Sequence, residues 1–230
     1  MRLVRLWRTG WRQDGKNGYL WGFFTPELRS YEYRDTRAGS VPVEVLGEDF
    51  GGVVTCDFYA GYNRFDALQR RWVHLLRDAK ELAESNPDRP AVAAWEAALR
   101  ELYQEAKAFS SPRERARRQA RREYERQAAA RARPFAEDPE APQRVLSQRI
   151  LKHLSELFVF VEHPEVAGEN NLAERSLRPA VIARKVSGGT RSDTGSEVWT
   201  GLMSLLSTWA AQGKPWLANC RELLLPTPAH

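Results

Sequence analysis

The chain reads Gly51-Gly-Val-Val-Thr-Cys56 and continues as Asp57-Phe-Tyr-Ala-Gly-Tyr62. The first part is a compact, β-branched run, which predicts a buried strand. Asp57 follows directly, so its carboxylate is expected to project from the carboxyl end of that strand, where α/β enzymes place ligand-binding groups. An acid at this place often only begins a loop, and the sequence leaves both interpretations open.

Two further elements are expected upstream of this strand. Aromatic and apolar residues on both sides of Thr25-Pro-Glu-Leu28, where proline favours a turn, predict a hairpin from Gly18 to Asp35. The segment that starts at Ser40 predicts a short helix, which Gly47 ends.

The pattern becomes mostly helical after Tyr62. Prolines near positions 87, 112 and 134 separate the segments of helix-forming composition. The expected helices are Trp72 to Glu84, Ala91 to Phe109, Arg113 to Arg133, and Val145 to Val161. A long helical insertion is therefore expected to interrupt the sheet, and the fold class is α/β.

Two helices are expected near the end of the chain. The first runs from Leu172 to Arg178 and stops before Pro179. The second begins at Thr194, whose hydroxyl forms a capping box with Glu197. Its expected apolar face is Val198, Leu202, Leu205, Leu206 and Trp209.

Composition limits the classes of protein to consider. The 230 residues, 42% of them hydrophobic, can bury a sizeable core in one domain or in one domain with an insertion. No apolar run approaches the roughly 20 residues of a membrane span, and no secretory signal is recognised, so the expected location is the cytoplasm. Cys56 and Cys220 have no Cys/His cluster around them, so neither disulfides nor a zinc site is expected.

The basic residues are concentrated in one segment. Arg113 to Arg133 contains nine arginines and three glutamates, a net charge of +6, whereas the whole chain has a net charge of +5. Such a helix can contact phosphates, but charge runs are often solvated faces with ion pairs along the helix. If the helix contacts phosphates, the arginines of this segment that we expect to bind DNA are Arg117, Arg118, Arg121 and Arg122.

A second basic group follows a candidate carboxylate. Glu174 lies in Asn170-Asn-Leu-Ala-Glu-Arg-Ser-Leu-Arg-Pro179, where Asn171 as N-cap would put Glu174 at the third helical position. Taken alone, helix capping is favoured over catalysis for this residue. The cations near it suit an anionic substrate such as a DNA strand; they are Arg175, Arg178, Arg184, Lys185 and Arg191.

Several motifs, in order from about Thr9 to Leu217, resemble the insertion-sequence-sixty-six family of bacterial transposases, which are of the DDE type. The similar segments are Thr9-Gly-Trp-Arg, Gly15-Lys-Asn-Gly-Tyr-Leu-Trp21, Thr36-Arg-Ala-Gly39, Leu46-Gly-Glu-Asp-Phe50, Asp57-Phe-Tyr-Ala-Gly-Tyr62, Trp72-Val-His-Leu-Leu-Arg77, Glu162-His-Pro-Glu-Val166, Asn170 to Pro179, Arg184-Lys185, Gly188-Gly189 and Ser204-Leu-Leu-Ser-Thr208.

The resemblance implies a ribonuclease-H-like mixed sheet core with a long helical insertion. Two Asp and one Glu would bind two magnesium ions, and Asp57 matches the second Asp and Glu174 the Glu. Two such metals can activate a water or a DNA 3′-hydroxyl and stabilise the leaving oxygen. The implied partners are insertion-sequence ends and target DNA, with a homo-oligomer as the active assembly. The expected divisions are core residues 9–66, the insertion 67–165, core helices 166–217 and a tail 218–230.

The chain departs from the family at the first Asp. That residue stands two positions before Thr-Gly-Trp-Arg, and here the position is Trp7. Because Met1 to Arg8 is also unlike an apolar strand, the first core strand is expected to be missing or altered, in an N-terminally truncated or degenerate copy. Three hypotheses follow: a magnesium-dependent DDE transposase impaired by Trp7, a non-catalytic DNA-binding remnant, and a fragment that does not fold stably.

Overall fold

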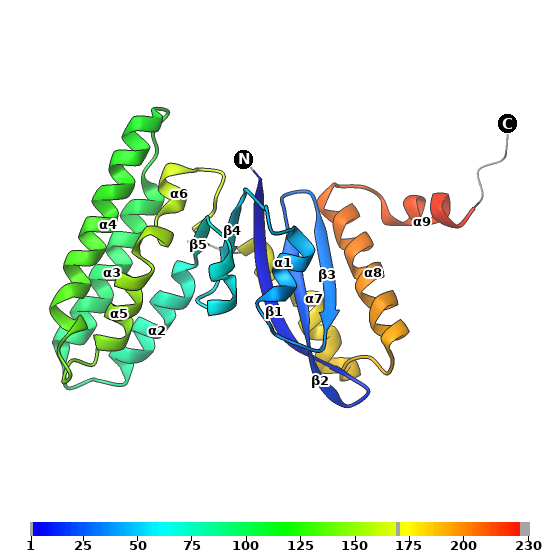
Figure 1. The fold of residues 1–230 in the computed structure, drawn as a ribbon, viewed down its shortest axis with the longest axis horizontal. Coiled ribbons are helices and arrows are strands. Elements are labelled where there is room, and N and C mark those ends of the chain that lie inside the picture. Colours follow the sequence, from blue (N-terminus) through cyan, green and yellow to red (C-terminus); the bar gives the residue numbers. More distant parts are fainter. Residues whose placement is uncertain (1, 169–170, 226–230) are drawn as a thin grey trace. The chain divides into compact units, whose positions relative to one another are not determined.

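The computed structural model describes residues 2–168 and 171–225. The chain forms two compact units, each made of two separate segments. The first unit comprises Met1–Leu3 and Gly51–Asn170, and the second comprises Val4–Phe50 and Asn171–His230. The chain therefore passes early into the second unit, leaves it, and returns to it in its last part (Figure 1).

Three strands of the second unit form an antiparallel meander: β1 (Leu3–Gln13), β2 (Lys16–Phe24) and β3 (Arg29–Arg34). Asp14 and Gly15 join the first two strands with φ angles of 49° and 75°, as a two-residue hairpin turn requires. In the next turn, the hydroxyl of Thr25 accepts hydrogen bonds from the N–H groups of Glu27 and Leu28. The hairpin predicted around this turn is confirmed.

β1 corrects the expectation of a missing or altered first strand. The expectation that this strand is missing is wrong, because β1 is 11 residues long and runs through Trp7. Its register with β2 pairs Leu6 with Phe23 and Trp7 with Gly22, and Leu6 is fully buried. Backbone pairing with β2 carries the strand through a sequence that lacks a continuous apolar run.

The first unit contributes β4 (Val53–Cys56) and β5 (Leu68–Arg70), which are parallel to each other. The N–H of Val53 donates to the carbonyl of Arg2, 3.0 Å away, just before β1. The strand order is β3-β2-β1-β4-β5. The predicted strand ending at Cys56 and the α/β class are confirmed, and α1 (Ser40–Leu46), which ends at Gly47, confirms the predicted short helix.

The sequence pattern does not predict β5, which lies just before the first helix expected at Trp72. The side-chain amide of Gln69 donates to the carbonyl of Leu157 at 3.0 Å and accepts from the N–H of Phe160 at 3.1 Å. These partners lie far along the chain, so local composition cannot reveal this short strand.

Helices complete the first unit (Figure 1). They are η1 (Ala60–Arg64), α2 (Trp72–Glu84), α3 (Pro90–Ala108), α4 (Glu114–Ala136), α5 (Arg144–Lys152), η2 (Leu154–Glu156) and α6 (Val159–Glu162). Trp72, fully buried, lies at the centre of their core. Its ring centroid is 5.3 Å from that of Tyr103 and 5.1 Å from that of Phe158. Aromatic packing therefore holds α2, α3 and the segment before α6 together.

The helices predicted at Trp72 to Glu84, Ala91 to Phe109 and Arg113 to Arg133 are confirmed within a few residues. The prediction of a single helix from Val145 to Val161 is wrong. The chain leaves the helix after α5 and turns, because this path buries Leu157 and its apolar neighbours in the core.

The other helices of the second unit are α7 (Asn171–Ser187), α8 (Asp193–Ala211) and α9 (Trp216–Leu224). The prediction that a helix stops before Pro179 is wrong, since α7 continues through it. Leu177 and Ala180, on both sides of Pro179, are buried in one cluster with Trp11 and Leu20 of the sheet. This burial offsets the backbone hydrogen bond that proline removes.

α8 differs from its prediction in its cap and in its buried face. Ser192, rather than Thr194, caps the helix and accepts a hydrogen bond from the N–H of Gly195 at 3.0 Å. Val198 and Leu202, which were expected to face the core, are 55% and 53% exposed. The apolar face predicted for α8 is therefore wrong at these positions.

Hydroxyl groups of α8 pair with the edge of β3 instead. Ser204 Oγ accepts from the N–H of Tyr31 at 2.8 Å, and Thr208 Oγ1 accepts from the N–H of Arg29 at 3.0 Å. Thr208 Oγ1 also donates to the carbonyl of Arg29 at 3.1 Å. β3 is an edge strand, so the backbone N–H and carbonyl groups on its outer side have no neighbouring strand to pair with. The hydroxyl groups of α8 provide these backbone groups with hydrogen-bond partners.

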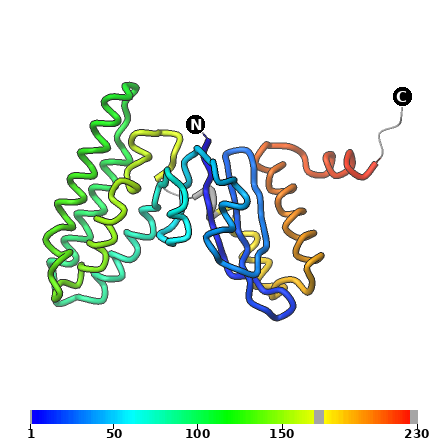
Figure 2. Tube along the Cα trace, viewed as in Figure 1, coloured from blue at the N-terminus to red at the C-terminus, as the bar shows by residue number. Residues whose placement is uncertain are grey.

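α9 has a different environment from the other long helices. It follows Gly213, which has a φ of 67°, and runs away from α8 (Figure 2). No side chain of α9 is buried. None of the helices in the described part of the chain is long and apolar enough to cross a membrane.

Replacing Thr208 tests the contact between α8 and β3. Thr208→Val keeps the shape of the side chain but leaves the N–H and carbonyl of Arg29 without that partner. We expect the free energy of unfolding to fall by about 1 to 3 kcal/mol in urea denaturation. The matched control Thr194→Val changes an exposed position of the same helix and should have no measurable effect. Equal stabilities of the two variants would contradict this role of Thr208.

Candidate functional site

Asp57 follows β4 in the first unit, as the sequence predicts. One carboxylate oxygen, Oδ1, accepts a hydrogen bond from the N–H of Tyr59 at 2.8 Å. This contact fixes the start of the loop that leads to η1, which is the simpler of the two interpretations of an acid at a strand end. The carboxylate is half-buried.

A fully buried guanidinium organises the backbone around Asp57. Arg70, at the end of β5, donates from Nη1 to the carbonyl of Asp57 at 2.6 Å and to that of Tyr59 at 3.3 Å. Its Nη2 donates to Oδ1 of Asn63, and its Nε lies 2.5 Å from Oε2 of Glu156. One side chain thus connects β4, η1, β5 and η2. Sequence reasoning missed Arg70, since its role depends on the unpredicted strand β5.

The electrostatic surroundings of Asp57 include two basic side chains of the next segment. Arg71 is buried, and His74 is half-buried in the first turn of α2. Burial, followed by the charge of Arg71, lowers the pKa of His74, and the charge of Asp57 partly opposes this shift. The neutral imidazole is therefore favoured, which agrees with a packed histidine and not with a charged one.

Glu174, the second predicted carboxylate, lies in α7 of the second unit. Its side chain, and the cap predicted at Asn171, fall outside the described part of the structure. Asp57 and Glu174 belong to different units, so their meeting at a common metal site stays a prediction.

The described residues do not complete a site for two magnesium ions. Among them, no three His, Cys, Asp or Glu side chains gather in a way that would hold a metal. Trp7, at the position expected for the first Asp, packs against the cluster that contains Trp11 and Leu20. An indole offers no oxygen ligand, and magnesium requires hard oxygen ligands. At the position where the resemblance expects the first Asp, this side chain therefore cannot bind magnesium.

The α4 arginines assigned to DNA are largely occupied within the first unit. Arg118 and Arg121 form ion pairs with Glu162, at 3.0 and 2.8 Å. Burial alone would raise the pKa of Glu162, but hydrogen bonds and charge from Arg121 and Arg118 bring it below its ordinary value. Arg117 donates to the carbonyl of Glu162 at 2.9 Å, whereas Arg122 pairs with no described residue. Part of the basic charge of α4 thus stabilises its contact with α6.

The second basic group lies on α7 and in the loop after it. Arg175, Arg178, Lys185 and Arg191 are exposed. Arg184 differs, because its Nη1 donates to Oγ1 of Thr9 and to the carbonyl of Gly10, both at 2.9 Å. Arg184 is therefore fixed against β1.

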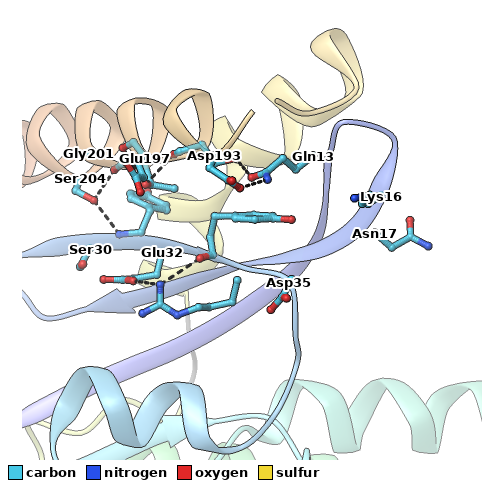
Figure 3. Close-up of a pocket in the computed structure, with 15 residues that line it drawn as sticks. Gln13, Lys16, Asn17, Ser30, Glu32, Asp35, Asp193, Glu197, Gly201 and Ser204 are labelled. Atoms are coloured by element: carbon cyan, nitrogen blue, oxygen red, sulfur yellow. Dashed lines mark hydrogen bonds and ion pairs between the residues drawn. The ribbon is translucent and has the colours of Figure 1, made fainter. Parts of the chain in front are cut away.

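A cavity of about 790 Å³ lies between β3 and α8 in the second unit (Figure 3). The side-chain amide of Gln13 donates to Oδ1 of Asp193 at 2.5 Å in the wall of this cavity. Four acids line the cavity, Glu32, Asp35, Asp193 and Glu197, with Lys16 and Arg34 as the basic residues. Burial, then Asp35 and Asp193, raise the pKa of Tyr33 beside it. An acidic excess makes this cavity unsuitable for a nucleic-acid backbone.

The sequence model of the Transposase IS66 family matches residues 4–198. The chain belongs to this family. The match spans segments of both structural units, from β1 to the beginning of α8. Membership gives this transposase a role in DNA transposition. No curated protein and no solved structure matches it.

Removing the buried guanidinium tests its structural role in the transposase. Arg70→Met leaves three backbone or amide oxygens without their donor, and we expect a loss of about 3 kcal/mol or more in unfolding free energy. Hydrogen exchange should show faster exchange of the Tyr59 amide. Arg126→Met removes an exposed arginine from the same unit and should leave both measurements unchanged. A stable Arg70→Met variant with a protected Tyr59 amide would contradict the assigned role.

The stability of the first unit should also depend on pH. The pKa of His74 and that of His153 are lowered in the folded state, in both cases mainly by burial. The contribution of these histidines to the free energy of unfolding is therefore fully present above the unfolded histidine pKa, about 6.5. It declines as the pH falls below that value, because the unfolded chain binds the additional protons. His74→Gln should make urea unfolding less dependent on pH between about 6.5 and 5.5. An unchanged slope would contradict this assignment.

Proposed function

We propose that this transposase-family chain binds element DNA in the cytoplasm through a ribonuclease-H-like core, and that its strand-cutting and strand-joining activity is impaired. The observation that carries the proposal is Trp7, which stands in β1 where the resemblance places the first catalytic Asp. The fold contributes support: three antiparallel strands are followed by two parallel strands, with a helical insertion before α7. Such an order suits a ribonuclease-H-like core.

The metal-binding part of the proposal concerns Asp57 and Glu174. Bound to carboxylates, magnesium would activate a nucleophile and stabilise the leaving oxygen of a phosphodiester. Because Trp7 supplies no oxygen ligand, the residues present do not fit a complete centre for two magnesium ions. Asp57 retains a defined position through Tyr59 and Arg70.

DNA binding is supported by charge that the described structure does not neutralise internally. Arg178, Lys185 and Arg191 are exposed along α7 and the loop after it. Cations of this kind release counterions from DNA when they contact phosphates, so the affinity should fall steeply with salt. Pairing of two element ends would require an assembly of more than one copy.

Restoring the carboxylate tests the proposed impairment. Trp7→Asp should give strand-transfer product from DNA of the element ends with magnesium or manganese, whereas the natural chain should give none. Trp7→Asn is the matched control, since it makes the same reduction in size without adding a charged ligand. All three proteins should bind DNA, and thermal melting should verify that the variants are folded.

Two outcomes would refute the proposal. Product from the natural chain would show that Trp7 does not impair catalysis. Absence of product from folded, DNA-bound Trp7→Asp would show that the missing carboxylate is not the cause of the impairment.

A further inference from the structure

A second cavity of the second unit, about 440 Å³, has the opposite charge from the acidic one. It lies where the β1–β2 hairpin meets the end of α7. Its lining residues are Gly10, Trp11, Arg12, Asn17, Gly18, Tyr19, Arg184 and Gly188. They include two arginines and no acidic residue, so the cavity has the composition of an anion site.

The loop after α7 builds one wall of this cavity. The N–H of Thr190 donates to the carbonyl of Arg12, and the N–H of Asp14 donates to the carbonyl of Thr190, both at 2.9 Å. Gly189, at a φ of 119°, lies so close that an added Cβ would stand 2.0 Å from the carbonyl oxygen of Arg12. Only glycine permits this approach, which fixes the loop to the end of β1.

The two arginines differ in how they are held. Arg184 is fixed by its Nη1 bonds to Thr9 and Gly10, and its other donors bond none of the described residues. Arg12 is exposed on β1, and its side chain forms no hydrogen bond or ion pair with the described residues. One fixed and one adaptable guanidinium, with the amide of Asn17 beside them, can together bind the oxygens of a phosphate.

Positive charge continues along the same hairpin. The guanidinium carbon of Arg8 lies 5.7 Å from the ring centroid of Tyr19 and 5.3 Å from that of Trp21. These cation–π contacts hold Arg8 beside Tyr19, which itself lines the cavity. The positive field around the cavity therefore comes from three arginines.

We propose that this cavity binds a backbone phosphate of the DNA on which the transposase acts. Arg12 and Arg184 donate to the phosphate oxygens, and Asn17 and the backbone at Gly188 complete the pocket. The proposal rests on the proposed DNA-binding function and adds β1 and the β1–β2 hairpin to the surface that contacts DNA. Sequence reasoning assigned only Arg184 of these residues to DNA.

The test measures binding of a labelled DNA duplex by fluorescence anisotropy over a range of salt concentrations. Arg12→Gln should weaken the affinity for DNA about tenfold. It should also make the slope of log affinity against log salt concentration less steep by about 0.9, the value for one lost phosphate contact. Arg221→Gln is the matched control, because it removes the same charge from an exposed position on α9. It should bind DNA like the natural chain.

The outcomes distinguish this proposal from the function on which it rests. No DNA binding by the natural chain would overturn both. Binding that Arg12→Gln and Arg221→Gln affect equally would overturn the phosphate pocket alone. A second measurement compares inorganic phosphate with chloride at the same ionic strength and follows the NMR chemical shift of the Gly188 amide. If phosphate shifts this amide while Arg12→Gln binds DNA with unchanged affinity, the cavity is a site for free anions, and the proposal is overturned.

Discussion

The backbone hydrogen bonds of β1 are the constraint on which the sheet depends. A strand inside a sheet needs partners for its N–H and carbonyl groups, and β1 obtains them from distant parts of the sequence. β2 pairs with most of its length, Val53 bonds to Arg2 at its start, and Thr190 bonds to Arg12 near its end. These partners are main-chain groups, so they fix β1 whatever its side chains are.

This independence of side chains bears directly on function. The strand accommodates Trp7, because the indole packs against an apolar cluster of the second unit. Catalysis has no such tolerance, since each metal ligand must be an oxygen at a defined place. Phosphate binding lies between these cases, because several arginines can share it. The proposed impairment of catalysis would therefore leave the fold and the proposed DNA binding intact.

The sequence predicted elements whose signals are local. Turn residues identified the hairpin around Thr25, and helix-forming composition identified α2, α3 and α4. It failed at β5, at Pro179 and on α8, where partners far along the chain decide the structure: Leu157 for β5, sheet residues for α7, and the β3 edge for α8. At the candidate site, the position of Asp57 was predicted, whereas Arg70 was missed because its acceptors lie in three other places along the chain: after β4, in η1 and in η2.

We propose that this transposase binds DNA through its basic residues but lacks the metal-dependent cleavage that a complete set of carboxylates would support. The most direct measurement follows bound complex and cut DNA in parallel on gels, with the natural chain in EDTA and in magnesium at equal ionic strength. We expect the same fraction of bound DNA in both conditions and no cleavage in either. Cleavage in magnesium, or binding that requires the metal, would contradict it.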